Sequence, residues 1–178
     1  MKNRNSPAKK SATLKAVVAL ASLTLLTSCS LDGGTGSAQK ENAMTNAASE
    51  REYMSVSADF GKEPKIGQPI GDAPAALVTK DIVVGNGTEV VSTSTLTVHY
   101  VLISWATGKV IQSSWSGQPA IFPLSGVIQG WQQGMPGMKV GGRRLLVIPP
   151  DLAYGASGSG PIGPNETLAF VVDVVNVN

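Results

Sequence analysis

Cysteine and histidine are scarce: the 178-residue chain has one of each. The single Cys29 cannot form an internal disulfide, so the fold has to be stable without one. The two residues cannot supply a His/Cys metal cluster, and a Ser-His-Asp triad would have to recruit His99 from within a predicted strand. We therefore expect no metal and no cofactor, and we interpret His99 as a strand-surface residue.

A hydrophobic run long enough for a permanent transmembrane helix is absent from the N-terminal region. The apolar run at 16–26 is shorter than the roughly 20 residues that a spanning helix needs. It follows five basic residues and precedes small residues, the pattern of an export signal. We predict a cleaved signal peptide at 1–28.

The residues around Cys29 define the expected anchor. Leu26-Thr27-Ser28-Cys29 resembles the lipobox of bacterial lipoproteins, which implies fatty acylation, such as palmitate, at Cys29. We therefore expect lipid anchoring to the cell membrane on its extracytoplasmic side, with residues 29–49 as a flexible tether of low apolar content. The alternative is an unpaired thiol inside an ordinary signal peptide.

Excess positive charge is missing from the mature part. Five of the 14 Lys and Arg residues lie in the predicted signal, with none of the 12 acidic residues, which leaves a net charge of −3. Nucleic-acid binding requires a basic face, and only Lys139, Arg143 and Arg144 cluster. We expect no nucleic-acid partner.

Short β-type segments bounded by turn residues dominate from residue 76 onward. We expect strands within 76–84, 95–105, 109–114, 120–124, 143–150 and 167–177. Alternation across 96–100 places Tyr100 on the inward face. One short helix, from about Ile128 to Met135, ends at Pro136 and Gly137. We predict an α+β fold: a mostly antiparallel sheet with one short helix.

Residues 50–75 have an intermediate character. Tyr53, Val56 and Phe60 can pack, while glycines and prolines interrupt any helix or long strand. An extended arm on the domain is our interpretation, with its order left open.

The segment from Gly126 to Phe170 gathers apolar residues among glycines and prolines, with few ionisable groups. These apolar residues are Val127, Ile128, Trp131, Tyr154, Ile162 and Phe170. Such a segment is suited to holding an apolar ligand. GSGPIG at 158–163 matches a dinucleotide fingerprint, but two prolines oppose the helix that this fingerprint needs, so we interpret it as a turn-rich loop.

Five spaced motifs identify a family. VHY at 98–100, GVIQGW at 126–131, MKVG at 138–141, PDLAYG at 150–155 and PNETLAF at 164–170 resemble the FKBP-type peptidyl-prolyl cis-trans isomerases, in that family's order. The resemblance covers about 76–178 and implies the FKBP-like fold, a sheet wrapped around one short helix. It also implies isomerase activity, which needs no nucleophile and no metal.

The resemblance also implies roles for individual residues. Trp131 would form the floor of the proline pocket, and Tyr154 and the Ile128 N–H would be catalytic hydrogen-bond donors. Walls would come from Tyr100, Val127, Ile128 and Phe170, and Ile162 would overhang the site. Ile111 and Gln112 stand where the family usually has a Phe-Asp pair, and we count both as substrate-binding.

Three departures from the family pattern affect the expected site. Gln112 removes the pocket carboxylate, Ala120 replaces an aromatic expected after Pro119, and Ser159 replaces the usual loop histidine. We expect weaker macrolide binding, while the effect on turnover stays open.

Two functional hypotheses follow. The first is a membrane-tethered isomerase that acts on proline-containing segments of exported proteins. The alternative is a non-catalytic peptide-binding chaperone or scaffold with a degenerate pocket. A solute-binding lipoprotein is a third class, for which the mature chain is small.

Overall fold

The computed structural model describes residues 51–178. The predicted signal peptide, Cys29 and the tether at 29–49 therefore lie outside the described residues. Within 51–178, no helix has the length and apolar character needed to cross a membrane.

Six strands form one antiparallel sheet in the order β1-β5-β6-β2-β3, with β4 also paired to β2. The strands are β1 (Val78–Val83), β2 (Thr95–Ser104), β3 (Val110–Ser113), β4 (Ala120–Pro123), β5 (Arg143–Ile148) and β6 (Leu168–Val177). Each lies within one of the segments expected from the sequence. The α+β fold class is thus confirmed, because one sheet is combined with one short α-helix.

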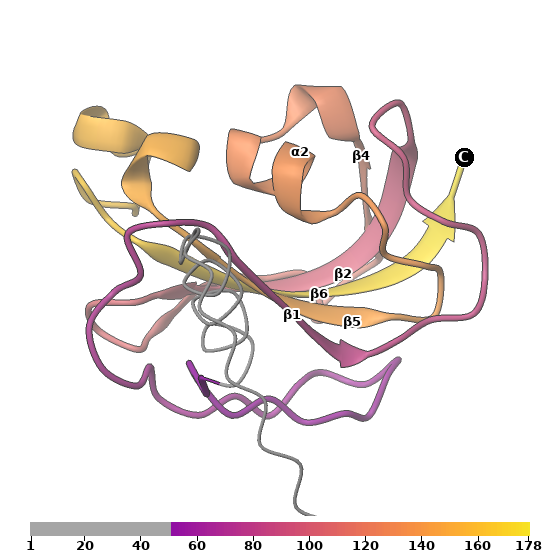
Figure 1. The fold of residues 1–178 in the computed structure, drawn as a ribbon, viewed down its shortest axis with the longest axis horizontal. Helices are drawn as coiled ribbons and strands as arrows, with labels where there is room; N and C mark the ends of the chain where they lie inside the picture. The colour runs from indigo at the N-terminus through magenta and orange to yellow at the C-terminus, as the bar shows by residue number, and fades with distance from the viewer. Residues whose placement is uncertain (1–50) are drawn as a thin grey trace, which may run out of the picture. The chain divides into compact units, whose positions relative to one another are not determined.

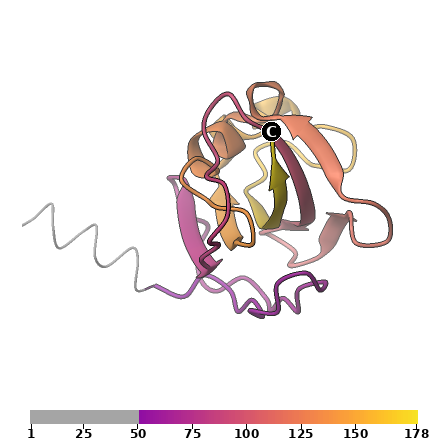
Figure 2. The same ribbon diagram turned by 90° about the vertical axis from the view of Figure 1, so that its right-hand side faces the viewer.

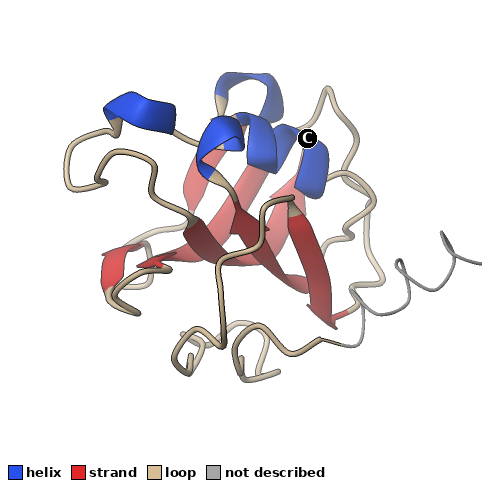
Figure 3. Ribbon diagram, turned by 60° about the vertical axis from the view of Figure 1, so that its left-hand side comes forward, coloured by secondary structure: helices blue, strands red, loops and turns tan. Residues whose placement is uncertain are grey.

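The helix α2 (Gln129–Gly134) lies over one face of the sheet (Figure 1). Three short 3-10 turns lie on the same side, as the helical segments in Figure 3 show: η1 (Leu124–Gly126), η2 (Pro150–Leu152) and η3 (Gly155–Ser157). A Cβ atom on Gly130 would overlap the Ile148 side chain, and one on Gly134 would crowd Leu146. The two glycines therefore allow the helix to approach β5 closely.

Both faces of the sheet are buried. The side chains of β6 from Leu168 to Val174 are buried throughout, so alternate residues of this strand enter two separate apolar cores. The first core lies under α2 and includes Leu96, Val98 and Leu146. The second lies on the opposite face and includes Val101 and Leu145.

Residues 51–75 cover the second core, below the sheet in Figure 1 and again in Figure 2. The segment doubles back on itself, with hydrogen bonds from the Gly67 N–H to the Ser55 carbonyl and from the Ile70 N–H to the Tyr53 carbonyl. Tyr53 and Met54 are buried against the sheet. We call residues 51–75 the arm.

A buried ion pair attaches the arm to the sheet. The Arg143 guanidinium donates from Nε to Asp173 Oδ1 at 2.5 Å and from Nη2 to Oδ2 at 2.8 Å. It also donates to the backbone carbonyls of Ser57 at 2.7 Å and Lys62 at 2.6 Å. Asp173 in turn accepts a hydrogen bond from the Gly61 N–H at 3.1 Å.

Two residues of the cluster of basic residues noted in the sequence, Arg143 and Arg144, make internal contacts in the structure. Arg143 is fully buried, and Arg144 donates from Nε to Asp81 at 2.6 Å. Arg144 further donates to the carbonyl of Gly134 at the end of α2. Two of the three clustered cations are thus used in structural contacts.

Arg143→Met should lower the free energy of unfolding by about 3–5 kcal/mol, because it leaves the Asp173 carboxylate buried without its partner. Urea denaturation monitored by circular dichroism measures the change. Lys109→Met serves as the control, since Lys109 is exposed and has no ion pair within the described residues. Its effect should stay within about 0.5 kcal/mol. Equal effects of the two variants would contradict the role given to the pair.

Candidate functional site

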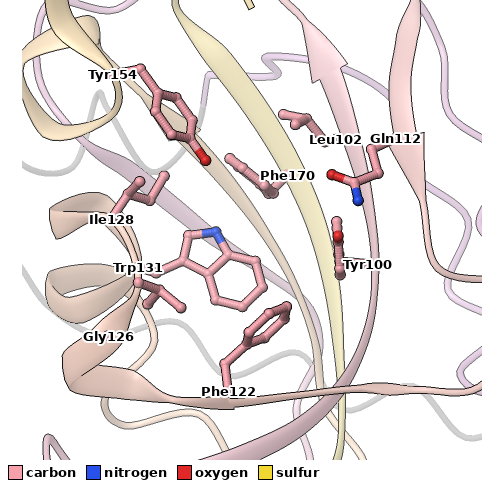
Figure 4. Close-up of a pocket in the computed structure, with 10 residues that line it drawn as sticks. Tyr100, Leu102, Gln112, Phe122, Gly126, Ile128, Trp131, Tyr154 and Phe170 are labelled. Atoms are coloured by element: carbon pink, nitrogen blue, oxygen red, sulfur yellow. The ribbon is translucent and has the colours of Figure 1, made fainter. Parts of the chain in front are cut away.

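A cavity of about 470 Å³ opens between α2, the turns after β5 and the helix-covered face of the sheet. Figure 4 shows the side chains that surround it. Ten residues line the cavity: Tyr100, Leu102, Gln112, Phe122, Gly126, Val127, Ile128, Trp131, Tyr154 and Phe170.

Trp131 on α2 forms the base of this cavity. Three aromatic rings stand nearly perpendicular to its indole. The distance between ring centroids and the angle between ring planes are 5.9 Å and 86° for Tyr100, 6.2 Å and 86° for Phe122, and 5.4 Å and 84° for Phe170. Edge-to-face pairs of this kind are favourable beyond the area that they bury. The indole is therefore held by aromatic contacts on several sides.

The indole Nε1 of Trp131 is buried and has no hydrogen-bond partner among the described residues. Buried donors are nearly always paired in proteins, and exceptions often mark functional positions. The base of the cavity thus combines an apolar ring system with one unused donor.

The backbone before α2 presents a second unused donor. Ile128 is the N-cap of the helix, and its carbonyl accepts hydrogen bonds from the N–H groups of Trp131 at 3.0 Å and Gln132 at 3.2 Å. Its own N–H makes no hydrogen bond within residues 51–178. The Gln132 side chain donates to the Val127 carbonyl at 2.7 Å and so fixes this turn.

Tyr154 lies on the opposite rim, between η2 and η3. Its ring is 38% exposed and its hydroxyl points toward the cavity (Figure 4). No hydrogen bond ties this hydroxyl to another described residue.

The second phenol of the cavity, Tyr100, has a pKa above its usual value. Burial is the larger cause, and the neighbouring Tyr154 adds to it, so Tyr100 is neutral at physiological pH.

Seven of the nine predicted pocket residues line this one cavity. They are Tyr100, Gln112, Val127, Ile128, Trp131, Tyr154 and Phe170. Ile111 and Ile162 do not line it. Ile162 is buried in the first core, and Ile111 is half-buried against the same core. Both therefore pack in the core to which the cavity residues Tyr100, Trp131 and Phe170 also belong.

Phe122 is the main residue that the sequence reasoning missed. The expectation that Ala120 deprives the pocket of an aromatic wall is wrong, because Phe122 supplies the ring two residues later. Register explains this: Ala120 pairs with Val98 and Phe122 with Leu96, and both partners are buried in the first core. The alternation Ala120-Ile121-Phe122 was the signal that could have found it.

Leu102 and Gly126 also line the cavity without having been predicted. Leu102 continues the inward alternation of Leu96, Val98 and Tyr100 along β2. As for metal binding, residues 51–178 contain no group of three or more histidine, cysteine, aspartate or glutamate side chains that could hold an ion.

Comparison with known proteins assigns the family. Residues 87–175 match the model of the FKBP-type peptidyl-prolyl cis-trans isomerases. A probable FK506-binding protein of Corynebacterium glutamicum is 49% identical over 116 residues, covering 65% of this chain and 98% of the relative. The chain belongs to the FKBP-type peptidyl-prolyl cis-trans isomerase family. It is accordingly an isomerase, and its reaction is rotation about the peptide bond before proline.

Further relatives of this isomerase agree with the assignment. An FK506-binding protein of Streptomyces anulatus is 47% identical over 121 residues, covering 65% of this chain and 98% of the relative. The crystal structure of FkpA from Escherichia coli superposes with a TM-score of 0.57 at 31% identity, covering 79% of this chain and 58% of that one.

Phe122→Ala should raise KM for a proline peptide about eightfold, because losing contact with roughly 50 Å² of apolar surface at about 25 cal/mol per Å² costs about 1.25 kcal/mol. Isomerisation kinetics at several peptide concentrations measure it. Ile121→Ala is the matched control on the same strand, since Ile121 is 65% exposed and points away from the cavity. Equal KM values in the two variants would show that the Phe122 ring does not contact the substrate.

Proposed function

We propose that this isomerase is tethered to the extracytoplasmic side of the cell membrane and accelerates proline-limited folding of exported proteins. The observation that carries the catalytic part is the aromatic cavity on Trp131, with its unused hydrogen-bond donors. The proposed tethering to the membrane rests on the lipobox-like sequence Leu26-Thr27-Ser28-Cys29.

The proposed mechanism rests on the electronic change during rotation. The barrier to rotation about a peptide bond is ~18–20 kcal/mol, because the amide loses its resonance in the twisted state. The twisted amide has less charge separation than the planar one. A cavity walled by Trp131, Phe122 and Phe170 excludes water and so favours the twisted state over the solvated planar state.

Two hydrogen bonds orient the substrate in this proposal. The proline ring lies on the Trp131 indole, and the Ile128 N–H donates to a substrate carbonyl. The Tyr154 hydroxyl donates to a second carbonyl from the opposite rim. Neither group has to transfer a proton, so the mechanism needs no titrating acid or base.

The position of the arm supports tethering that leaves the cavity open. The described chain begins at Arg51, whose guanidinium lies 5.3 Å from the centre of the Tyr53 ring in the second core. That core lies on the face of the sheet opposite the cavity. The described residues therefore begin on the side of the sheet away from the cavity.

FK506-like ligands belong to the same proposal. The relatives in Corynebacterium glutamicum and Streptomyces anulatus are named for FK506 binding. We propose that this chain binds such a macrolide more weakly than a family member with a pocket carboxylate would. Gln112 presents a neutral carboxamide to the ligand in place of a charged acceptor, and hydrogen bonds to charged groups are the stronger ones.

Tyr154→Phe should lower kcat/KM for a proline peptide about two- to tenfold, the effect of one lost hydrogen bond worth roughly 0.5–1.5 kcal/mol. Relaxation of a cis-proline peptide with detergent-solubilised full-length protein measures it. Tyr53→Phe, in the second core, is the control and should leave the rate unchanged. A wild-type rate equal to the spontaneous one would overturn the proposed catalysis. A second assay follows refolding of a secreted protein with a proline-limited phase.

Cys29→Ser should move the protein from the membrane fraction to the soluble extracytoplasmic fraction, because the acyl chains would have no attachment point. Each buried methylene contributes about 0.8 kcal/mol, and stable anchoring takes more than one chain. Fractionation and mass spectrometry of the N-terminal peptide measure this. Ser30→Ala is the control. An unacylated wild-type Cys29 would contradict the anchor without affecting the isomerase activity.

A further inference from the structure

The cavity has a polar wall without fixed charge. No aspartate, glutamate, lysine, arginine or histidine is among its ten lining residues. The ionisable groups that line it are the phenols of Tyr100 and Tyr154. Its remaining polar side chains are Gln112 and the indole N–H of Trp131. A substrate inside this cavity therefore meets hydrogen-bonding groups and no net charge.

Gln112 reaches the cavity through its pairing with β2, next to an irregularity in β3. Leu102 pairs with Gln112 and Ile103 with Val110, which leaves Ile111 as the extra residue of a bulge. Directly paired residues lie on the same face of a sheet, so Gln112 shares the face of its partner Leu102, which itself lines the cavity. Figure 4 shows Gln112 beside Leu102 and Tyr100, across the cavity from Ile128 and Tyr154.

The Gln112 carboxamide is free to bind a ligand. It is exposed at the cavity mouth, and no hydrogen bond joins it to another residue within 51–178. A carboxamide offers both a donor and an acceptor, whereas an ionised carboxylate only accepts. A peptide backbone presents both donors and acceptors, so this side chain can donate a hydrogen bond to a backbone carbonyl or accept one from a backbone N–H.

We propose that Gln112 determines the charge specificity of this isomerase: its carboxamide binds the peptide backbone beside the proline and leaves the site indifferent to the charge of the preceding residue. The inference rests on the proposed binding of the proline segment in this cavity. A carboxylate at position 112 would attract a cationic neighbour and repel an anionic one. The neutral wall accepts proline segments with either charge.

The test compares two peptides that differ only in Lys or Glu before proline, with detergent-solubilised full-length protein. The wild type should have kcat/KM values within about threefold of each other. Gln112→Glu should shift the Lys-to-Glu ratio toward Lys by about three- to tenfold, a moderate effect because position 112 is exposed at the mouth of the cavity. Val110→Glu makes the same charge change on the same strand, where the side chain is 59% exposed and does not line the cavity. It should leave the ratio unchanged.

Gln112→Met separates hydrogen bonding from charge. It should lower kcat/KM for both peptides about two- to tenfold, the effect of one neutral hydrogen bond, with the ratio unchanged. Circular dichroism checks the folding of each variant, and the Met variant has the closer match in size and charge.

Titration of the tryptophan fluorescence with the same peptides gives affinities independently of turnover. Acceleration of both peptides with a ratio that Gln112→Glu does not move would overturn the role of Gln112 and leave the proposed function intact. A wild type that binds without acceleration would contradict the proposed catalysis, and the affinity ratio would still decide the role of Gln112. A wild type that neither binds nor accelerates these peptides would overturn both.

Discussion

A sheet that is apolar on both faces has to be covered on both, and this constraint organises the protein. β6 is buried on each side along most of its length, so neither face can be left to water. The helix and the turns cover one face. The arm covers the other, and the buried Arg143–Asp173 pair attaches it through backbone carbonyls. Since an unpaired buried charge is costly, arm and sheet depend on each other.

The two coverings differ in a way that creates the site. The arm lies flat on the second core and closes it. The helix α2 covers only part of the first face, because it is short and held close to β5 at Gly130 and Gly134. The uncovered part, between α2 and the turns after β5, is the cavity. Trp131 projects from the helix into this space and meets the rings of Tyr100, Phe122 and Phe170.

The chemistry of the cavity follows from the same arrangement. Aromatic walls exclude water, while the donors at Trp131, Ile128 and Tyr154 have no partners in the described part of the chain. Rotation about a peptide bond requires no proton transfer, so a neutral site of this kind is sufficient. Gln112 adds a further neutral group where the family usually has a carboxylate.

The sequence by itself determined the strands, the helix and most of the cavity residues, because these depend on local alternation and on motifs with fixed spacing. Only the tertiary structure decided the rest. The pairing of β4 with β2 turned Phe122 into the cavity, and the pairing of β3 with β2 put Gln112 on the same face as Leu102. The burial of Arg143 and the docking of the arm required contacts between residues more than 80 positions apart. Such contacts leave no periodic signal, because their free energy comes from surfaces that exist only after the sheet has formed.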